Sequence, residues 1–266
     1  MHGRVIATAR LTPNIVRVVL GGDGLDGFEP VPYTDAYVNV AIPPAGAPYT
    51  APFDLAEVKA QLPREQWPVR RRYTVRRFDP VERLLILDVV VHGDAGVGGP
   101  WAATAVPGDA LVFTGPGGGY RPDPDADWHL LVGDEAALPA IAASLEAIPS
   151  GAPTIVRLVC DGPEHEVELA SPGALDLAWL HRTGAPSDAD LLPDAVRHLD
   201  VPPGRVHAFV HGEAGEVRAI RRHLLAERGV AREDLSCSPY WRRHLTDEAW
   251  REIKPRWKAE VERDVA

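Results

Sequence analysis

The pattern of apolar residues changes character near the middle of this chain. Up to about residue 122, short apolar or alternating runs follow one another closely, separated by Gly and Pro rather than by helical segments. Closely spaced strands without long intervening helices are typical of an antiparallel barrel. We expect one short helix at 54–61 and strands at 5–10, 15–20, 37–42, 71–77, 84–91 and 110–113.

The second half of the chain alternates strand patterns with helix patterns. A Pro- and Asp-rich segment at 121–125 precedes it and suits a hinge. Alternation of this kind predicts βαβ units and a parallel sheet. The expected strands are 128–132, 154–160, 176–181 and 206–211, and the expected helices are 135–147, 190–199 and 215–228.

A last amphipathic helix is expected at 247–261. Trp250, Ile253 and Trp257 share one of its faces, and Thr246 can cap its start. Pro255 should bend or split it. We therefore expect a barrel domain at 1–122, an α/β domain at 126–240 and a C-terminal helical extension at 241–266.

Composition excludes several classes of protein. A chain of 266 residues can hold two separate cores, and its net charge of −10 argues against a nucleic-acid partner, which needs a basic surface. Without a signal-peptide pattern or an apolar run of 18 residues, we expect a cytoplasmic protein with no membrane partner. Cys160 and Cys237 are expected as free thiols rather than a single disulfide. The pair His207 and His211 lacks a third ligand nearby, so we interpret it as structural and expect no metal.

The arginine-rich segment at 71–76 is the first candidate binding element. In a strand, Arg72, Thr74 and Arg76 face one way, while Tyr73 and Val75 face the other. Guanidinium groups bind phosphate oxygens bidentately, and an aromatic ring can lie against a planar heterocycle. A flavin nucleotide would use both, although such a strand can also be a solvated edge.

A second candidate element is a helix start approached through glycines. We expect this helix to begin near Trp101, after Gly98 and Gly99, with Pro100 in its first turn. A helix N-terminus of this kind offers amide donors and a positive dipole end to a phosphate. Opposite Arg72, it would hold a pyrophosphate from two sides.

Taken in order, these segments and several others resemble the siderophore-interacting proteins, a branch of the ferredoxin-reductase-like flavoenzymes. The resemblance covers essentially the whole chain. The segments that carry it are RRYTVR at 71–76, DVVVHG at 88–93, GVGGPWA at 96–102, PGD at 107–109, GDEAALPAI at 133–141 and YWRR at 240–243. The resemblance implies a Greek-key barrel that binds FAD, followed by an α/β domain that binds NADH or NADPH.

The chain departs from the family pattern in three places. The family's Gly-Pro-Ala-Ser-x-Trp-Ala is replaced here around Gly98 to Pro100, which removes a hydroxyl and one amide donor. Ala136 stands where the family has Thr. Pro239 and His244 replace two glycines of Gly-Tyr-Trp-Arg-x-Gly. We expect these changes to affect FAD and nicotinamide binding first.

The resemblance also implies roles for single residues. Arg72 would hold the pyrophosphate, Tyr73 the ribityl chain or isoalloxazine, Thr74 the N5 edge and Val75 the pyrimidine edge. The other implied cofactor-binding residues are His92 near the adenosine, Gly98, Gly99, Trp101 and Ala102 at the helix start, and Asp134, Glu135 and Glu213 in the α/β domain. His92 can instead cap a strand, and Glu213 can instead cap a helix. Asp161 favours NADH, whereas Arg182 favours NADPH.

The C-terminal cations are the candidate substrate-binding residues. Trp241, Arg242, Arg243, Lys254 and Lys258 would form a basic pocket for an anionic ferric siderophore, although either lysine can be merely solvated. The implied function is electron transfer from NADH, NADPH or a ferredoxin through FAD to Fe(III), which releases Fe(II), with no side chain as general acid or base. Two alternatives remain: a flavoenzyme with another acceptor, such as a quinone or a ferredoxin-like partner, and a binding protein without reductase activity.

Overall fold

A computed structural model describes residues 1–91 and 96–264 of the chain. The chain forms two compact units, Met1–Gly119 and Tyr120–Ala266. Each unit has its own hydrophobic core, so each is described by itself. Within the described residues, no helix is both long and apolar enough to cross a membrane.

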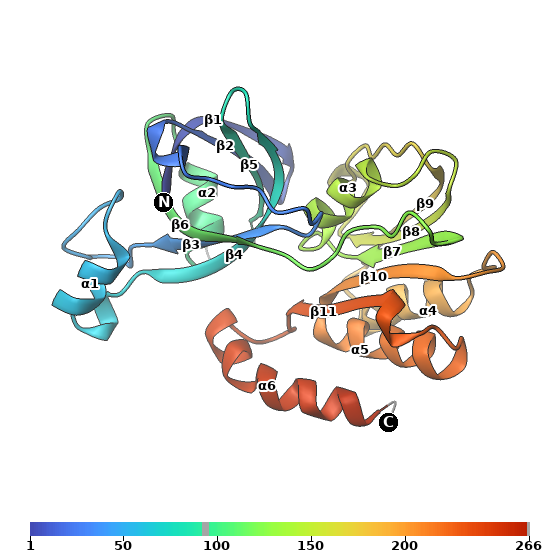
Figure 1. The fold of residues 1–266 in the computed structure, drawn as a ribbon. Helices are drawn as coiled ribbons and strands as arrows, with labels where there is room; N and C mark the ends of the chain where they lie inside the picture. The colour runs from blue at the N-terminus through green and yellow to red at the C-terminus, as the bar shows by residue number, and fades with distance from the viewer. Residues whose placement is uncertain (92–95, 265–266) are drawn as a thin grey trace. The chain divides into compact units, whose positions relative to one another are not determined.

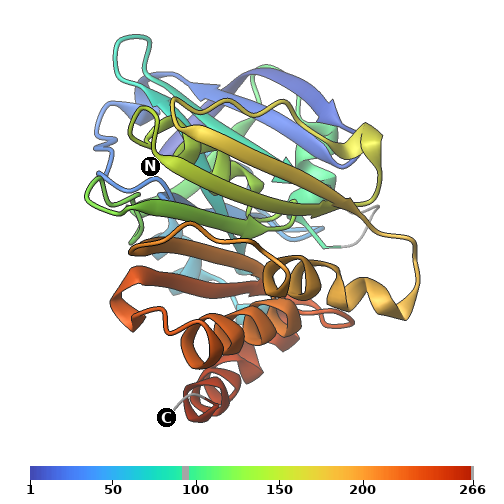
Figure 2. The same ribbon diagram turned by 90° about the vertical axis from the view of Figure 1, so that its right-hand side faces the viewer.

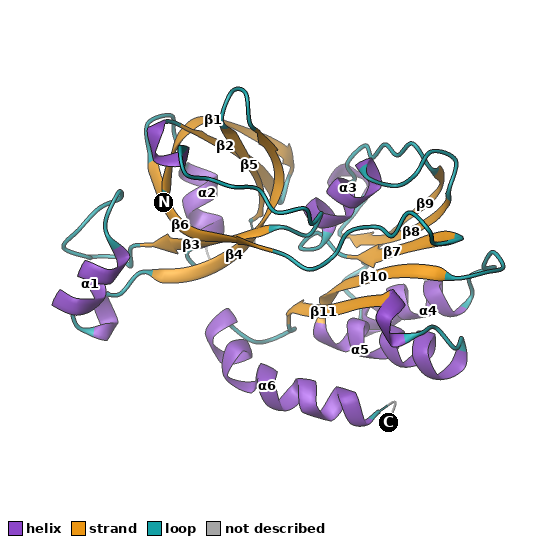
Figure 3. Ribbon diagram, in the orientation of Figure 1, coloured by secondary structure: helices purple, strands orange, loops and turns teal. Residues whose placement is uncertain are grey.

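The first unit is a closed antiparallel barrel (Figures 1 and 3). Its strands are β1 (His2–Thr12), β2 (Ile15–Gly21), β3 (Tyr37–Ile42), β4 (Val69–Asp79), β5 (Leu84–Val90) and β6 (Ala110–Gly117). They pair in the order β1-β2-β5-β4-β3-β6, and β6 returns to β1 to close the barrel. Val18, Val38, Leu85, Leu87 and Phe113 fill its interior. All six expected strands and the barrel are confirmed.

Two α-helices and two 3₁₀ helices (Asp23–Leu25 and Arg64–Gln66) accompany the barrel. The expected helix at 54–61 is α1 (Leu55–Gln61), which the side chain of Asp54 caps. Helix α2 (Gly98–Thr104) begins three residues before the predicted start at Trp101. It can do so because Pro100 still lies in the first turn, where a missing N–H costs no intrahelical bond.

The second unit is built on a five-stranded parallel sheet. Its strands are β7 (Trp128–Gly133), β8 (Pro153–Cys160), β9 (Ala174–His181), β10 (Val206–Glu213) and β11 (Leu235–Trp241). Their order is β11-β10-β7-β8-β9, and all four pairings are parallel; Figure 2 shows the strands stacked in this order. The expected parallel sheet is confirmed. Strand β11 was not predicted, because Pro239 interrupts its pattern, and proline is tolerated on an edge strand.

Helices connect the strands and cover the sheet. They are α3 (Leu138–Glu146), α4 (Leu191–Arg197), α5 (Ala214–Arg222) with a π turn at His223–Glu227, and α6 (Asp247–Arg263), besides 3₁₀ helices at Pro163–His165, Pro186–Asp190 and Arg232–Asp234. Leu192, Val196, Val217 and Ile220 from α4 and α5 pack on the sheet in one core cluster. Helix α3 begins at Leu138 rather than at 135, because residues 134–137 form a turn.

Helix α6 packs on the rest of the second unit through a narrow apolar stripe. Trp250, Trp257 and Val261 are buried with Ala214, and the two tryptophan rings meet edge to face at 5.6 Å. Ile253 is 41% exposed, so the prediction that it shares the buried face is wrong: the stripe is too narrow to include it. Pro255 does not split the helix, whose axis changes direction along its length (Figure 1). Cys160 and Cys237 are free thiols, as expected.

Candidate functional site

Strand β4 of the barrel presents a guanidinium next to an aromatic ring. Tyr73 and Val75 pack against the barrel core, whereas Arg72 is exposed, as the alternation predicts. The guanidinium of Arg72 lies 5.2 Å from the centroid of the Tyr37 ring. Arg72 forms no ion pair with a carboxylate of residues 1–91 or 96–264. The positive charge of Arg72 is therefore available to an anionic ligand such as a phosphate.

The start of α2 lies directly against Tyr73. A Cβ atom added to Gly98 would stand 1.8 Å from the Tyr73 hydroxyl oxygen, so a larger residue there would displace the Tyr73 ring. The structure thus brings together Tyr73 and Gly98, which the sequence predicted as parts of one site. Trp101 and Ala102 pack toward the barrel core, and Ala102 is only 1% exposed, which leaves its backbone as the group that could reach a ligand.

Two other predicted flavin contacts on β4 are constrained. The side chain of Thr74 is buried, although alternation puts it on the exposed face. The N–H of Val75 donates to the carbonyl of Ala36 at 2.6 Å, so this donor would have to give up a bond to serve a ligand. A register shift between Val75 and Arg77 interrupts the regular alternation of β4, which accounts for the burial of Thr74. His92 lies outside the described residues.

In the second unit, Asp134 joins two distant segments. Its carboxylate accepts a hydrogen bond from the Trp241 indole Nε1 at 2.6 Å and another from the backbone N–H of Ala136 at 2.9 Å. Burial, and then the charge of Glu135, raises the pKa of Asp134 to about 6. Gly212, at φ +142°, leaves room for this carboxylate: an added Cβ would lie 2.7 Å from Oδ2. Asp134 is thus a structural partner of Trp241.

Glu213 caps helix α5 and also binds the segment after β11. Its carboxylate accepts hydrogen bonds from the N–H groups of Gly215 (2.6 Å) and Glu216 (3.1 Å). The backbone N–H of Arg243 donates to Glu213 at 3.1 Å, and the guanidinium of Arg243 bonds both Glu213 and Glu216. The alternative of a helix cap is therefore confirmed for Glu213.

Glu216 belongs to this cluster but was not predicted from the sequence. It is 2% exposed, and its Oε2 has no hydrogen-bond partner within the described part of the chain. Burial raises its pKa to about 7. Its position three residues after Glu213, on the same face of α5, was the only available signal. Two buried carboxylates, those of Glu213 and Glu216, thus share one guanidinium, that of Arg243.

Glu135, Asp161 and Arg182 form a second charged cluster. The guanidinium of Arg182 holds Glu135 bidentately at 2.6 and 2.9 Å, and it also bonds Asp161 at 2.9 Å. Burial lowers the pKa of Arg182, but the hydrogen bonds and negative charges of Glu135 and Asp161, with the charge of Asp134, together raise it above its ordinary value. The two residues that indicated opposite nicotinamide cofactors are therefore bonded to each other.

The predicted substrate-binding residues differ in what they contact. Arg243 is paired with buried carboxylates, and its guanidinium lies 5.9 Å from the Trp241 ring, so it serves the fold. Lys254 donates to the carbonyl of Pro239 at 2.6 Å, which ties α6 to β11. Arg242 is half-buried and Lys258 exposed, and neither has an ion pair within residues 1–91 and 96–264.

The histidine pair on β10 is packed among aromatic rings. His207 accepts a hydrogen bond from the N–H of Asp123 at 3.0 Å, and His211 stacks on Phe209 at 3.8 Å. Burial lowers the pKa of His211 to about 3, which keeps it neutral. Both histidines therefore have structural surroundings, which agrees with the interpretation from the sequence.

Asp134 and Glu213 lie at the edge of the sheet where a ligand site is expected in this fold. Strand order reverses between β7 and β10, and ligands of open α/β sheets bind at the carboxyl ends of the strands at such a point. Asp134 directly follows β7, and Glu213 ends β10. The predicted α/β residues thus surround the usual ligand crevice of this fold.

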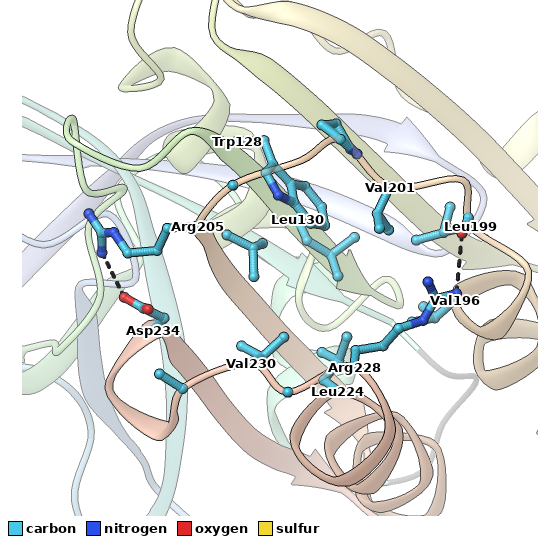
Figure 4. A pocket seen from close by; sticks show the side chains of 15 residues that line it. Trp128, Leu130, Val196, Leu199, Val201, Arg205, Leu224, Arg228, Val230 and Asp234 are labelled. Atoms are coloured by element: carbon cyan, nitrogen blue, oxygen red, sulfur yellow. Dashed lines mark hydrogen bonds and ion pairs between the residues drawn. The ribbon is translucent and has the colours of Figure 1, made fainter.

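A cavity of about 300 Å³ opens at the other end of the sheet (Figure 4). Trp128 and Val206, the first residues of β7 and β10, line it, and the rest of its wall is mostly apolar. The charged side chains at its rim already have hydrogen-bond partners. Arg205 bonds Asp234 at 2.7 Å, and Arg228 donates to the Leu199 carbonyl at 3.2 Å. The cavity therefore offers little chemistry and lies away from the strand ends described above.

Comparison with known proteins identifies the family. Residues 4–120 match the model of the siderophore-interacting FAD-binding domain, and residues 126–244 match that of the siderophore-interacting protein. Over 248 residues the chain is 37% identical to the ferric vibriobactin reductase ViuB of Vibrio cholerae, covering 91% of this chain and 89% of that protein. The chain belongs to the siderophore-interacting protein family.

Other similar proteins agree with this assignment. A siderophore utilization protein from T. fusca has a solved structure that superposes with a TM-score of 0.80 at 38% identity, over 93% of this chain and 94% of that one. The NADPH-dependent ferric-chelate reductase of Escherichia coli is 28% identical, over 89% of this chain and 91% of that protein. The predicted family and two-domain fold are therefore confirmed.

The barrel fits the flavin that the family's domain binds. Its matched segment, 4–120, spans both Arg72 on β4 and Gly98 at the start of α2. The exposed guanidinium suits a diphosphate, and the glycine lets backbone approach the half-buried Tyr73 ring. The three substituted motif positions do not remove these features.

Proposed function

We propose that this protein is a cytoplasmic, flavin-dependent ferric-siderophore reductase. Electrons would pass from NADH or NADPH through FAD to Fe(III), and the siderophore would release the Fe(II) product. The observation that carries the proposal is the contact of Tyr73 with Gly98 beside the exposed Arg72, inside a barrel that matches the family's FAD-binding domain. Relatives named as ferric reductases support the choice of acceptor.

The barrel residues would hold the flavin. Bound FAD would supply the conversion of a two-electron hydride donor into single-electron reduction of iron. Arg72 would bind the diphosphate, and Tyr73 would orient the ring system or its ribityl chain. Thr74, Val75, His92, Gly99, Trp101 and Ala102 are proposed as the remaining flavin contacts, mainly through backbone groups where side chains are buried.

The α/β residues would bind the nicotinamide donor at the reversal of strand order. Asp134 and Glu213 hold the loop and the helix that border this crevice, and Glu135 fixes Arg182 beside it. The guanidinium of Arg243 pairs with Glu213. Their task is to shape the crevice and set its charge, because hydride transfer needs no protein proton donor.

The substrate would be recognised by the residues after β11. Ferric siderophores are often anionic, so cations without an internal partner are the ones that can attract them. Arg242 and Lys258 meet this condition, and Trp241, which precedes Arg242 and is held by Asp134, offers an aromatic surface. We propose that 241–266 forms the substrate-binding extension, with Lys254 anchoring it to β11.

Anaerobic reoxidation tests the proposal. The FAD-loaded protein is reduced with excess NADH or NADPH, the donor is removed, and ferric catecholate, hydroxamate and citrate chelates are added separately. We expect the flavin absorbance to return and Fe(II) to appear with at least one chelate, and Arg242→Ala to slow this step about tenfold by removing one charge contact. The matched control is Arg256→Ala, since Arg256 is exposed and paired with Glu260.

The outcomes separate the alternatives. Reduced flavin that persists with every chelate but is reoxidised by a quinone would identify another acceptor. A protein that binds FAD and ferric chelates without transferring electrons would be a binding protein. Reduction by a ferredoxin but by neither nicotinamide would keep the reductase and change its donor.

A further inference from the structure

The ends of three neighbouring strands bring Glu135, Asp161 and Arg182 together. The parallel register pairs Gly133 with Leu158 and Cys160 with His181. Glu135 follows β7 by two residues, whereas Asp161 and Arg182 directly follow β8 and β9. The backbone N–H of Arg182 also donates to the Cys160 carbonyl at 2.8 Å, which fixes this residue at the end of β8.

This position is where a dinucleotide's adenosine ribose meets the protein. In doubly wound sheets of this strand order, an acidic residue after the second strand bonds the ribose 2′-hydroxyl of NAD, whereas an arginine nearby accommodates the 2′-phosphate of NADP. Counting from β7, the second strand is β8. The chain has both residue types there, so the residue types alone favour neither cofactor.

The contacts of Arg182 decide between the two. Three of the five N–H donors of its guanidinium are used: Nη1 bonds Glu135 and Asp161, and Nη2 bonds the second oxygen of Glu135. The Glu135 side chain is only 5% exposed, so withdrawing Arg182 would leave a buried carboxylate without its counter-ion. Arg182 is therefore held by two carboxylates, and a 2′-phosphate would have to compete with them for its guanidinium.

The exposed member of the cluster is a carboxylate. The Asp161 side chain is 55% exposed, against 18% for Arg182, so an approaching ribose meets Asp161 first. Two carboxylates and one guanidinium give the cluster a net negative charge, and a 2′-phosphate would add nearly two more negative charges. A ribose diol, in contrast, can donate hydrogen bonds to Asp161.

We propose that this protein selects NADH over NADPH through the cluster of Glu135, Asp161 and Arg182. The inference rests on the proposed nicotinamide-dependent function and deepens it. Asp161 would bind the ribose diol, and Glu135 would act as a positioning residue that keeps Arg182 from serving as a phosphate site.

Calorimetric titration of the FAD-loaded protein with ADP-ribose and with 2′-phospho-ADP-ribose tests specificity without any turnover. We expect ADP-ribose to bind at least roughly tenfold more tightly, because the phosphate meets like charge. Asp161→Asn removes the exposed charge and one partner of Arg182; it should weaken ADP-ribose, strengthen the phosphorylated probe and reduce their ratio about tenfold. Glu135→Gln should strengthen the phosphorylated probe further by releasing Arg182.

Asp176→Asn is the matched control, because Asp176 pairs with Arg157 at 2.9 Å but lies near the start of β9 rather than after a strand end. It should leave both affinities unchanged. Equal or tighter binding of the phosphorylated probe, or a ratio that Asp161→Asn does not alter, would overturn the inference while leaving the reductase intact. If neither probe binds and neither nicotinamide reduces the flavin, the proposed donor itself is wrong.

Discussion

Glu216 is a buried carboxylate in the second unit whose negative charge is only partly neutralised by its neighbours. Glu216 shares the guanidinium of Arg243 with Glu213, and one of its oxygens has no partner within the described residues. Burial raises the pKa of Glu216 to about 7 from its ordinary value of 4.5. Between these two pH values the folded protein binds a proton that the unfolded chain does not, so ionisation of Glu216 lowers the free energy of unfolding as pH rises.

Replacing this carboxyl by an amide should remove that pH dependence. We expect Glu216→Gln to gain stability relative to the parent protein from pH 5 to pH 8, by at most about 3 kcal/mol at roughly 1.4 kcal/mol for each pKa unit. The measurement is the free energy of urea unfolding at several pH values. The comparison cancels the opposite effect of His129 and His211, whose pKa values burial lowers to about 4 and about 3.

Glu227→Gln is the control for this experiment. Its carboxylate accepts a hydrogen bond from His223, which lowers the pKa of Glu227, so its removal should bring no gain at high pH. Parallel pH profiles for Glu216→Gln and the parent protein would contradict the assignment of a raised pKa to Glu216.

At the scale of elements, the contact between β4 and α2 underlies the proposed flavin site. We expect Gly98→Ala to lower the free energy of unfolding by about 1–3 kcal/mol and to weaken FAD binding, because the added methyl group meets the Tyr73 hydroxyl. Tyr73→Phe in the same chain should restore part of the stability, since it removes the atom that collides. Urea unfolding and FAD titration measure both effects.

Gly27→Ala serves as the control, because no atom lies within 4 Å of its added Cβ. A double-mutant cycle separates relief of the collision from independent damage. If Tyr73→Phe and Gly98→Ala are simply additive, the two elements do not meet through the hydroxyl, and the site described on β4 and α2 has to be revised.

Elements were predictable where their pattern is local. The alternation of β4 and the capping Asp54 of α1 lie within a few residues of what they determine, so both elements were expected. Strand β11 was missed because its partner β10 lies elsewhere in the sequence, and its own pattern contains Pro239. The bond between Asp134 and Trp241 spans 107 positions, and no local pattern encodes it. The motifs therefore indicated candidate site residues, but not which of them bond to one another.

At the scale of the whole molecule, the chain's charge opposes its proposed substrate. The formal net charge is −10, so an anionic ferric chelate is repelled from a distance. Arg242 and Lys258 act at shorter range, since salt at 0.1 M screens exposed charges beyond about 10 Å. Salt screens both effects. Weakening the local attraction slows the encounter with the chelate, whereas weakening the general repulsion speeds it.

The salt dependence of reoxidation therefore reports which charges guide the chelate. We expect the second-order rate constant for an anionic ferric catecholate to fall as salt rises from 20 to 300 mM, because the local cations dominate the encounter. In Arg242→Ala/Lys258→Ala the attraction is gone while the net negative charge remains, so the same rate constant should rise with salt. Stopped-flow absorbance of the flavin measures both. The double variant Arg4→Ala/Arg10→Ala changes the net charge equally, at exposed positions on β1, and should keep the parent's negative slope. A positive slope in the parent protein, or the same inversion in both double variants, would show that Arg242 and Lys258 do not guide the substrate.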